Sequence, residues 1–513
     1  MRLVFLLALP ALGLGLGLAS CAVGPEYQRA EAPVPAQYKE MKGWKKATPA
    51  DGIDRGRWWS VYRDRELDRL VSQVEVNNQN VAAALAAYDQ TKALIRETQS
   101  GFFPTVSANY TATRSGDGAA ISGNSKSATA VVARPFASST YYPQLTGSWT
   151  LDVWGKIRRQ VEGNVAEAQA SAADLQNAKL SAQAQLAIAY FDLRTEDSLK
   201  TVLDRTIKLY RDTLTITQNQ YNAGTVSKAD LVTAQTQLLN AQAQAIATGV
   251  PRAQYEHSIA VLTGHPPSEL SIAPGALPHV PPSTPVSLPS ELLERRPDIA
   301  AAERAMQQQN AQIGVAVAAY YPTISLNAAG GFSGINAFPL TAAHLIWSLG
   351  GSAAEPLFEG GLHAAQVDAA AATYRQSVAT YRQTVLAAFQ QVEDQLSSLR
   401  ILARELKVQE QAVAAAREAV TVYLNQYRAG TVAFTTVVVA QATLLADEEA
   451  ALTTRQNLFV ASVTLIESLG GGWDAARLPD VAELAPPVPP MLPQSDVSLA
   501  PHVATELTNA GIR

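Results

Sequence analysis

Apolar side chains recur every three or four residues over a long stretch that contains no proline, from Gly155 to Tyr221. This spacing predicts one amphipathic helix with a single apolar stripe. At 1.5 Å per residue, the helix would be a rod of about 100 Å. A helix of that length without internal caps is typical of coiled coils and helical barrels rather than of compact globular cores. The stripe consists of Val161, Val165, Ala168, Ala172, Leu175, Ala178, Ala182, Leu186, Ala189 and Leu193.

Elsewhere polar and apolar residues alternate strictly, which predicts strands with one polar and one apolar face. The alternation is clear from Thr105 to Thr113, from Gln144 to Asp152 and from Thr323 to Ala328, and weaker from 346 to 358. We expect strands at about 104–114, 142–152, 322–333 and 345–358. Aromatic residues flank these segments at Phe102, Phe103, Tyr141, Tyr142, Tyr320 and Tyr321.

The polar faces of these strands carry Thr, Ser, Asn and Gln with almost no charge. Strands of this kind, apolar outward with aromatic ends, are typical of outer-membrane barrels, although each one alone also fits a half-buried strand of a soluble sheet. Four strands cannot close a barrel, and open sheet edges are not tolerated in lipid. We therefore expect several chains to share one barrel.

The chain contains an internal duplication. "QYNAGTVSKADLVTAQTQLL" begins at Gln220, and "QYRAGTVAFTTVVVAQATLL" begins 206 residues later at Gln426. Upstream, "FFPTVSAN" matches "YYPTISLN" at an offset of 218, so the first copy carries about a dozen extra residues between its Pro-Thr motif and Gly155. In each copy a glycine suits the left-handed end of a helix. Ser227 and Asp230 then form a capping-box pattern for the next helix. We predict two helical hairpins that turn at the same height.

The first twenty residues resemble a bacterial signal peptide, with Arg2 followed by an apolar stretch too short and glycine-rich to span a membrane convincingly. It ends in "LASC", which resembles a lipobox, so Cys21 is expected to carry a diacylglycerol and an N-acyl chain. A stray cysteine beside an ordinary cleavage site is the alternative. Cys21 is the only cysteine, so no intrachain disulfide can form. Ala22, rather than aspartate, predicts passage to the outer membrane.

These observations divide the chain into six segments. They are a signal peptide at 1–20, a lipidated extended segment at 21–60, a first repeat at 61–270, a Pro-rich linker at 271–290, a second repeat at 291–472 and a Pro-rich tail at 473–513 that we expect to be extended or disordered.

Catalytic and nucleic-acid-binding functions find no support in the sequence. A net charge of −5 without Lys/Arg-rich runs argues against a nucleic-acid partner. The six histidines are scattered, so we expect no metal site, and "GLGLG" lies within the signal segment. No serine or cysteine can be paired with a base. We expect neither catalysis nor a cofactor other than the lipid on Cys21.

Several longer motifs, in their order and spacing, resemble the TolC-type outer-membrane factors, specifically the lipoprotein (NodT-like) branch that serves resistance-nodulation-division (RND) efflux systems. The motifs include "CAVGPEY", "WWSVYRDRELDRLV", "GFFPTVSANY", "LDVWGKIRR", "LLERRPDIAAAERAMQQQNAQIGVAVAAYYPTISL" and "PLFEGGLHAAQVDAAAATYRQ", and they extend along nearly the whole chain after Cys21.

The resemblance implies an α+β fold in which long antiparallel helices form a periplasmic α-barrel and four strands contribute to a shared outer-membrane β-barrel. It also implies a homotrimer that works with a periplasmic adaptor and an inner-membrane RND transporter as a passive exit duct for small molecules. An exit duct for type I protein secretion stays open as an alternative. A non-channel periplasmic coiled-coil lipoprotein would explain the helices but not the four strands.

The resemblance further implies that the hairpin tips form a closed periplasmic gate, involving Tyr221, Gly224, Asp230, Tyr427, Arg428, Gly430 and Thr436. The family often carries a second acidic residue where this chain has Val439, so an acidic constriction would rest mainly on Asp230. Asp230 is equally explained as a helix cap. Ordinary packing at the tip is the alternative role for Tyr221, Tyr427 and Arg428.

Overall fold

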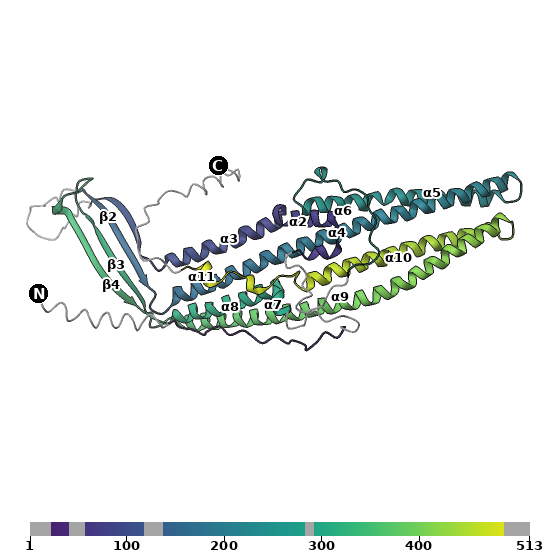
Figure 1. Cartoon of the computed structure of the whole chain (residues 1–513). Coiled ribbons are helices and arrows are strands. Elements are labelled where there is room, and N and C mark those ends of the chain that lie inside the picture. Colours follow the sequence, from purple (N-terminus) through teal and green to yellow (C-terminus); the bar gives the residue numbers. More distant parts are fainter. Residues whose placement is uncertain (1–21, 41–56, 117–136, 283–291, 487–513) are drawn as a thin grey trace, which may run out of the picture.

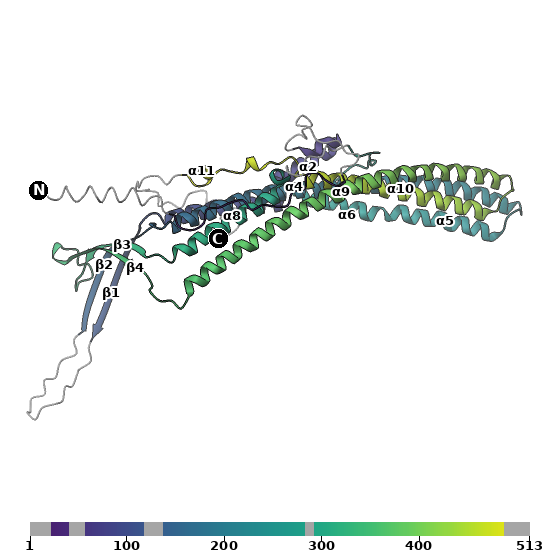
Figure 2. The same cartoon turned by 90° about the horizontal axis from the view of Figure 1, so that it is seen from below.

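The computed structural model describes residues 22–40, 57–116, 137–282 and 292–486. The molecule is elongated, with a four-stranded sheet at one end and two helical hairpins at the other (Figures 1 and 2). The first repeat comprises α2 (Arg65–Asn77), α3 (Gln79–Ser100), β1 (Thr105–Gly116), β2 (Ala137–Leu151), α4 (Lys156–Asn222), α5 (Lys228–Ala247) and α6 (Gly249–Leu262). The second comprises α7 (Leu292–Arg295), α8 (Pro297–Ala318), β3 (Thr323–Phe332), β4 (Leu345–Ala354), α9 (Leu362–Arg428) and α10 (Phe434–Ser468), and α11 (Val481–Leu484) follows it.

The two long helices show the duplication directly. α4 and α9 each contain 67 residues, and each begins after a glycine with positive φ, Gly155 at +80° and Gly361 at +90°. A side chain rarely adopts this conformation, which explains why both repeats place glycine at the junction between sheet and helix. The helix predicted between Gly155 and Tyr221 therefore has the expected length, and its equivalent lies 206 residues later.

The repeats differ after the turn. The second hairpin returns in one helix, α10, whereas the first returns in two, α5 and α6, which meet at Thr248. Pro251 lies in the first turn of α6 and has no amide hydrogen to donate to the carbonyl of Ala247, so the hydrogen-bond series is interrupted there. The equivalent position in α10 is Asn457, which keeps its amide hydrogen.

The four strands form one antiparallel sheet in the order β1-β2-β3-β4. The first hairpin is longer than expected, since β2 begins at Ala137 rather than near 142. The interpretation of Tyr141 and Tyr142 as residues at a strand end is therefore wrong, because they pair with Ala112 and Thr111 well inside the hairpin. β4 is shorter than expected and ends at Ala354 rather than 358.

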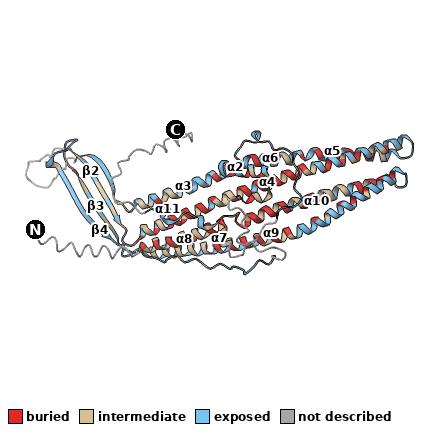
Figure 3. Cartoon of the chain, in the orientation of Figure 1, coloured by how far each residue is buried: buried red, intermediate tan, exposed pale blue. Residues whose placement is uncertain are grey.

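α4 is the central helix of the molecule. It packs against α3 of its own repeat on one side and against α8 and α10 of the other repeat, so it is buried on several faces rather than along one stripe. Ala166, Ala173 and Leu180 lie off the predicted stripe and are buried, whereas Val161 and Ala178 on the stripe are only partly buried. Figure 3 shows the buried residues of α4 concentrated toward the middle of the molecule.

Two segments outside the repeats pack along the helices. Residues 22–40 are extended as expected and run beside α8 and α9, where Tyr38 packs against Phe389. The later part of the predicted 21–60 segment is not extended, because Trp58–Tyr62 form a 3-10 helix whose tryptophans are buried.

The expectation of an extended or disordered tail is wrong for residues 473–486. Leu484 in this segment is buried against Ile95, while residues 487–513 lie outside the described residues.

Candidate functional site

The two hairpin turns have the same backbone geometry. Gly224 and Gly430 adopt φ of +73° and +74°, and their amides donate to the carbonyl oxygens of Tyr221 and Tyr427 at 2.9 and 3.0 Å. This left-handed glycine closes the end of each long helix. Both turns lie at the end of the molecule remote from the sheet (Figure 1).

The helix that follows each turn is capped differently. Ser227 Oγ accepts from the amide of Asp230 at 3.2 Å, and the Asp230 carboxylate accepts from the Ser227 amide at 3.1 Å. This reciprocal pair is the predicted capping box. In the second hairpin, Ala433 and Thr436 occupy the equivalent positions, and no side chain caps α10. The capping role of Asp230 is thus visible in the structure, whereas its role in a gate is not tested by it.

Tyr427 joins the two hairpins of the chain. Only 3% of its surface is exposed, its hydroxyl lies 3.2 Å from Thr217 Oγ1 on α4, and its ring packs against Phe434. Burial raises the pKa of the Tyr427 hydroxyl, the Thr217 hydrogen bond opposes this rise, and the Asp230 charge adds to it. The Asp230 carboxylate thus acts on the Tyr427 hydroxyl through its charge. The two residues come from different repeats.

The other predicted tip residues do not join this cluster. Tyr221 occupies the position in the first repeat that Tyr427 occupies in the second, yet 37% of its surface is exposed. Arg428 is exposed and donates to Asn425 of its own helix at 3.3 Å. Thr436 is partly buried and lines a groove between α9 and α10.

A buried hydrogen bond near the tips was missed by the sequence analysis. Gln441 Nε2 on α10 donates to Thr213 Oγ1 on α4 at 2.8 Å, and both side chains are fully buried. Buried polar groups that find partners favour one particular arrangement of helices. The available signal was a glutamine repeated at Gln235 and Gln441 in an otherwise apolar helical pattern.

The sheet separates polar from apolar side chains as the alternation predicted. On one face Val106, Leu145, Trp149, Leu326, Trp347 and Leu349 occupy matching register positions across all four strands. The other face carries polar pairs, such as Asn109 donating to Thr146 at 3.1 Å. Trp347 is 77% exposed and Leu349 78%. A face this apolar requires a cover that the single chain does not supply among its described residues.

The two outer strands each leave one edge open. Among the described residues, β1 pairs only with β2, and β4 pairs only with β3. Such an edge exposes a row of backbone donors and acceptors that a further strand can satisfy. Because neighbouring strands alternate in direction, β4 of one copy and β1 of another can pair in the same antiparallel sense as the other strands.

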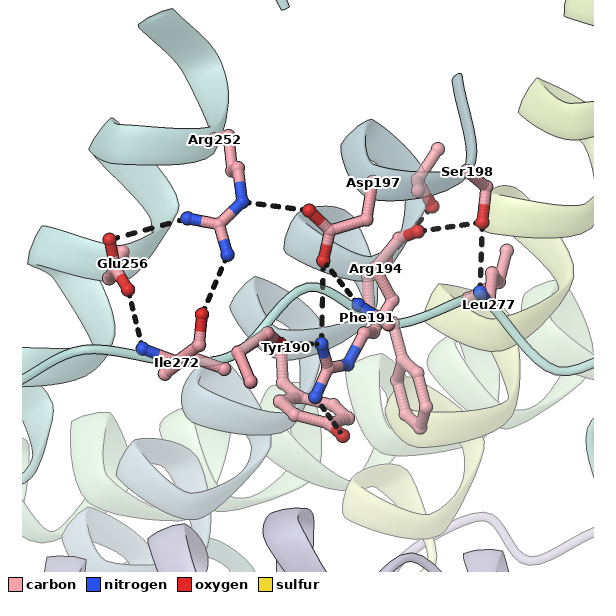
Figure 4. Close-up of polar contacts among 12 residues, drawn as sticks. Tyr190, Phe191, Arg194, Asp197, Ser198, Arg252, Glu256, Ile272 and Leu277 are labelled. Atoms are coloured by element: carbon pink, nitrogen blue, oxygen red, sulfur yellow. Dashed lines mark hydrogen bonds and ion pairs between the residues drawn. The ribbon is translucent and has the colours of Figure 1, made fainter. Parts of the chain in front are cut away.

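A buried cluster of charges, also missed by the sequence analysis, fastens the linker between the repeats to α4 (Figure 4). Asp197 accepts from Arg252 Nε of α6 at 2.7 Å and from the amide of Gly275 at 2.9 Å. Arg194 donates to the carbonyl oxygen of Ala273 at 2.6 Å and to the hydroxyl of Tyr190 at 3.0 Å. These contacts hold α4, α6 and the linker together.

The second half of this cluster lies on α6. Glu256 accepts from the amide of Ile272 at 2.6 Å, while Arg252 Nη2 donates to the carbonyl oxygen of the same residue at 2.7 Å (Figure 4). A Cβ at Gly275 would lie 2.7 Å from the Arg194 guanidinium, so any other residue at this position would displace that side chain. The cluster holds the chain in place and offers no exposed reactive group.

Among the described residues, no group of three or more His, Cys, Asp or Glu side chains is placed to hold a metal ion. No helix in the described part of the chain has both the length and the hydropathy needed to cross a bilayer. Cys21 lies outside the described residues.

The model of one protein family, described as outer membrane efflux protein, matches residues 70–265 and 288–471. The chain belongs to the outer membrane efflux protein family. The two matched segments correspond closely to the two repeats. The toluene efflux pump outer membrane protein TtgC of Pseudomonas putida is 28% identical over 467 residues, which cover 89% of this chain and 93% of TtgC. Nodulation protein T of Rhizobium leguminosarum bv. trifolii is 27% identical, with 89% of this chain and 96% of the relative covered.

Solved structures extend the similarity to the fold of this outer membrane efflux protein. The outer-membrane channel OprN superposes with a TM-score of 0.78 at 29% sequence identity, covering 88% of this chain and all of OprN. The predicted TolC-like fold is thereby confirmed, as is the predicted location in the outer membrane with an extension into the periplasm. The sheet is the membrane end of the molecule, and the helical hairpins lie at the periplasmic end.

Proposed function

We propose that three copies of this efflux protein close one continuous duct, through which small molecules delivered by an RND transporter and a periplasmic adaptor pass out of the cell. The observation that carries the proposal is the sheet, which exposes an apolar face and two unpaired edges. Lipid can cover the face, and strands of other copies can satisfy the edges. The long helices continue from this sheet as the wall of the duct.

The duct is passive in this proposal. Among the described residues the charged clusters hold helices and linkers together, and none pairs a nucleophile with a base, so no catalytic step is assigned to the chain. The name of the relative TtgC refers to an efflux pump, which supports a pump and an adaptor as partners rather than nucleic acid. The type I secretion alternative shares this architecture, whereas a non-channel coiled-coil lipoprotein does not account for the sheet.

The lipid on Cys21 would attach the duct to the membrane a second time. The amide of Val23 donates to the carbonyl oxygen of Trp154 at 3.1 Å, and Arg159 donates to the carbonyl oxygen of Val23 at the same distance. Trp154 and Arg159 lie where β2 passes into α4, at the boundary between sheet and helices. A lipid two residues before Val23 would therefore start at the level of the membrane surface.

At the opposite end, the tips would form the resting gate. The Tyr427 hydroxyl lies 3.2 Å from Thr217 Oγ1 of the first hairpin, and the Asp230 charge acts on it, which supports a role for both residues in holding the closed state. Tyr221, Arg428 and Thr436 would contribute only through contacts with other copies, because within the chain they do not join the Tyr427 cluster.

Deletion of the protein tests the proposed function. We expect cells without it to accumulate a fluorescent pump substrate as strongly as cells without the pump, and the double deletion should add nothing. Cross-linking in intact cells should recover an adaptor and an RND transporter. Unchanged accumulation together with loss of a secreted protein from the medium would favour the type I alternative and contradict the proposal.

A further inference from the structure

A cavity with charged side chains in its lining lies where α4 of the first repeat meets α9 and α10 of the second and the linker between the repeats. Its volume is about 470 Å³, which is within the range of small-molecule sites. The linker wall is held in place, because Ser198 Oγ accepts from the amide of Leu277 at 2.9 Å (Figure 4). The cavity opens to solvent beside the exposed side chains of Arg205 and His279.

The inner part of the lining is apolar. Val202 of α4, Val413 of α9, Leu452 of α10 and Leu277 of the linker all line the cavity, and each is buried. The four side chains come from four different elements, so an apolar surface faces the cavity from several directions. A compact apolar group could be enclosed there and lose contact with water.

Two ion pairs in the lining join α9 to α10. Arg417 Nε donates to Glu448 at 3.0 Å, and Arg455 Nη2 donates to Glu410 at the same distance. The residues of α10 are the less exposed members of the pairs, since the side chains of Glu448 and Arg455 are 10% and 17% exposed. The charges on α10 therefore lie at the cavity and not on the open surface of the helix.

The first repeat lacks the two charges of α10. Shifted back by 206 residues, Glu448 becomes Gln242 and Arg455 becomes Gly249. α5 and α6 nevertheless pack along α4. The duplicated hairpin can thus be built without these charges, so packing of the hairpin alone does not explain their presence in the second repeat.

Two guanidinium groups of the lining keep hydrogen-bond donors to spare. Arg455 Nε is buried and has no hydrogen-bond partner among the described residues. Arg205 Nε donates to the carbonyl oxygen of Thr201 on its own helix at 3.3 Å, and no carboxylate in the described part of the chain pairs with this guanidinium. The three arginines of the lining also outnumber its two glutamates. A ligand that supplies acceptor oxygens and a negative charge satisfies both groups.

We infer that the cavity binds a small organic anion. Its carboxylate accepts from Arg205 and Arg455, and its compact apolar body packs against Val202, Leu277 and Leu452. Because Arg205 belongs to the first repeat and Arg455 to the second, the bound anion joins the two repeats and stabilises their arrangement. The site goes beyond the proposed function and does not depend on it, since the whole lining belongs to one chain.

Equilibrium dialysis with 2-naphthoate tests the site, because this probe combines a carboxylate with a rigid apolar body. The detergent-solubilised protein should bind it in excess of the uptake by empty micelles. 2-Naphthamide has the same rings without the charge and should bind at least about tenfold more weakly. Equal binding of the two probes, or no binding of 2-naphthoate, overturns the inference. Either result leaves the duct intact if the protein is a trimer.

Arg205→Gln tests the anion contact with little risk to the fold, because Arg205 is exposed and its one bond is to its own helix. We expect the dissociation constant of 2-naphthoate to rise about tenfold or more. Arg211→Gln is the matched control. It removes one exposed positive charge from the same helix outside the lining, and it should leave binding unchanged. Equal weakening in both variants would reduce the effect to general attraction and overturn the site.

Ala276→Trp tests the location of the probe without changing any charge. Ala276 is an exposed linker residue of the lining, so a large side chain there should fill the cavity and abolish binding. 2-Naphthoate should raise the melting temperature of the wild-type protein but not that of this variant. If the folded tryptophan variant binds the probe as tightly as the wild type, the probe lies elsewhere and the inference is overturned. If this variant does not fold, the comparison of Arg205→Gln with Arg211→Gln decides alone.

Discussion

At the hairpin tips, the Asp230 carboxylate forms short hydrogen bonds with Ser227 and also acts through its charge on Tyr427. Asp230 accepts from the amide and hydroxyl of Ser227 at 3.1 and 2.8 Å, which caps α5, and its charge also acts on the buried Tyr427 hydroxyl. The second repeat lacks both partners of the cap, since Ala433 and Thr436 stand in the equivalent positions. An acidic ring at the tips would therefore depend on Asp230 alone, once per chain.

Substitution of Asp230 distinguishes the cap from the gate. Asp230→Asn keeps the size and some capping ability but removes the charge, so we expect it to reduce cation preference in planar-bilayer recordings. Asp230→Ala should reduce cation preference similarly and also cost about 0.5–1 kcal/mol of helix stability. If the asparagine variant keeps the original ion selectivity and only the alanine variant is less stable, Asp230 is a helix cap and has no part in selectivity.

Half-buried carboxylates in the middle of α4 make stability depend on pH. Burial raises the pKa of Asp192, although Gln456 donates to it at 2.7 Å, and burial together with the Asp192 charge raises the pKa of Glu196. A raised pKa means that the folded state binds protons more tightly than the unfolded state. The contribution to stability is present below the unfolded pKa of about 4 and is lost as pH rises through the folded pKa.

We therefore expect Asp192→Asn to raise the melting temperature at neutral pH and to flatten its dependence on pH between about 4 and 8. Asp204→Asn is the control, because Asp204 is an exposed carboxylate of the same helix paired with Lys200. Thermal unfolding of the detergent-solubilised protein measures both variants. A lower melting temperature of Asp192→Asn at neutral pH would show that the ionised carboxylate stabilises the fold.

Among the elements, those with local signals were predictable from the sequence. α4 and α9 could be predicted in full, because no proline interrupts them and glycine marks both ends. The extent of β2 could not, since Pro143 and the tyrosines before it become strand only by pairing with β1. The burial of α4 on several faces likewise depends on α8 and α10, which are distant in sequence. The pairing of Tyr427 with Thr217 joins the two repeats and has no local signal.

The charge cluster of α4 and α6 had no sequence signal either, because Asp197 acts on residues 55 and 78 positions away. Asp197→Ala leaves the buried guanidinium of Arg194, the partly buried guanidinium of Arg252 and the amide of Gly275 without this partner, so we expect it to cost about 2 kcal/mol. Asp204→Ala, which breaks an exposed pair, should cost at most about 0.5 kcal/mol. The urea concentration at the unfolding midpoint and the rate of proteolysis at residues 271–282 measure both. Equal losses of stability in the two variants would contradict the role of the charge cluster in holding the linker to α4 and α6.

On the scale of the whole molecule, each repeat supplies one strand hairpin to the sheet and one helical hairpin to the periplasmic end. Within the described residues, the single chain therefore leaves one surface uncovered at each end of the molecule. At one end these are the outer strand edges of the sheet, and at the other the groove between α9 and α10 near the hairpin tip. A ring of copies satisfies both with one head-to-tail contact. The amide of Val23 donates to Trp154, between β2 and α4, and this bond holds the N-terminal segment where the sheet meets the helices. The proposed lipid on Cys21 would therefore lie at the membrane surface.

The proposed anchor is tested at Cys21. We expect mass spectrometry of the mature protein to find a chain that begins at Cys21 and carries acyl chains. Cys21→Ser should abolish acylation while oligomers still insert, because the sheet provides a separate attachment to the membrane. An unmodified Cys21, or an uncleaved chain, would contradict the lipoprotein assignment.

Native mass spectrometry of the protein extracted in detergent tests the central claim most directly, because the claim is that no single copy can close the barrel. The account predicts one dominant species with the mass of three mature lipidated chains, and no stable monomer that forms pores. A pore-forming monomer would show that four strands suffice, and it would contradict the shared barrel, the ring and the gate built upon it.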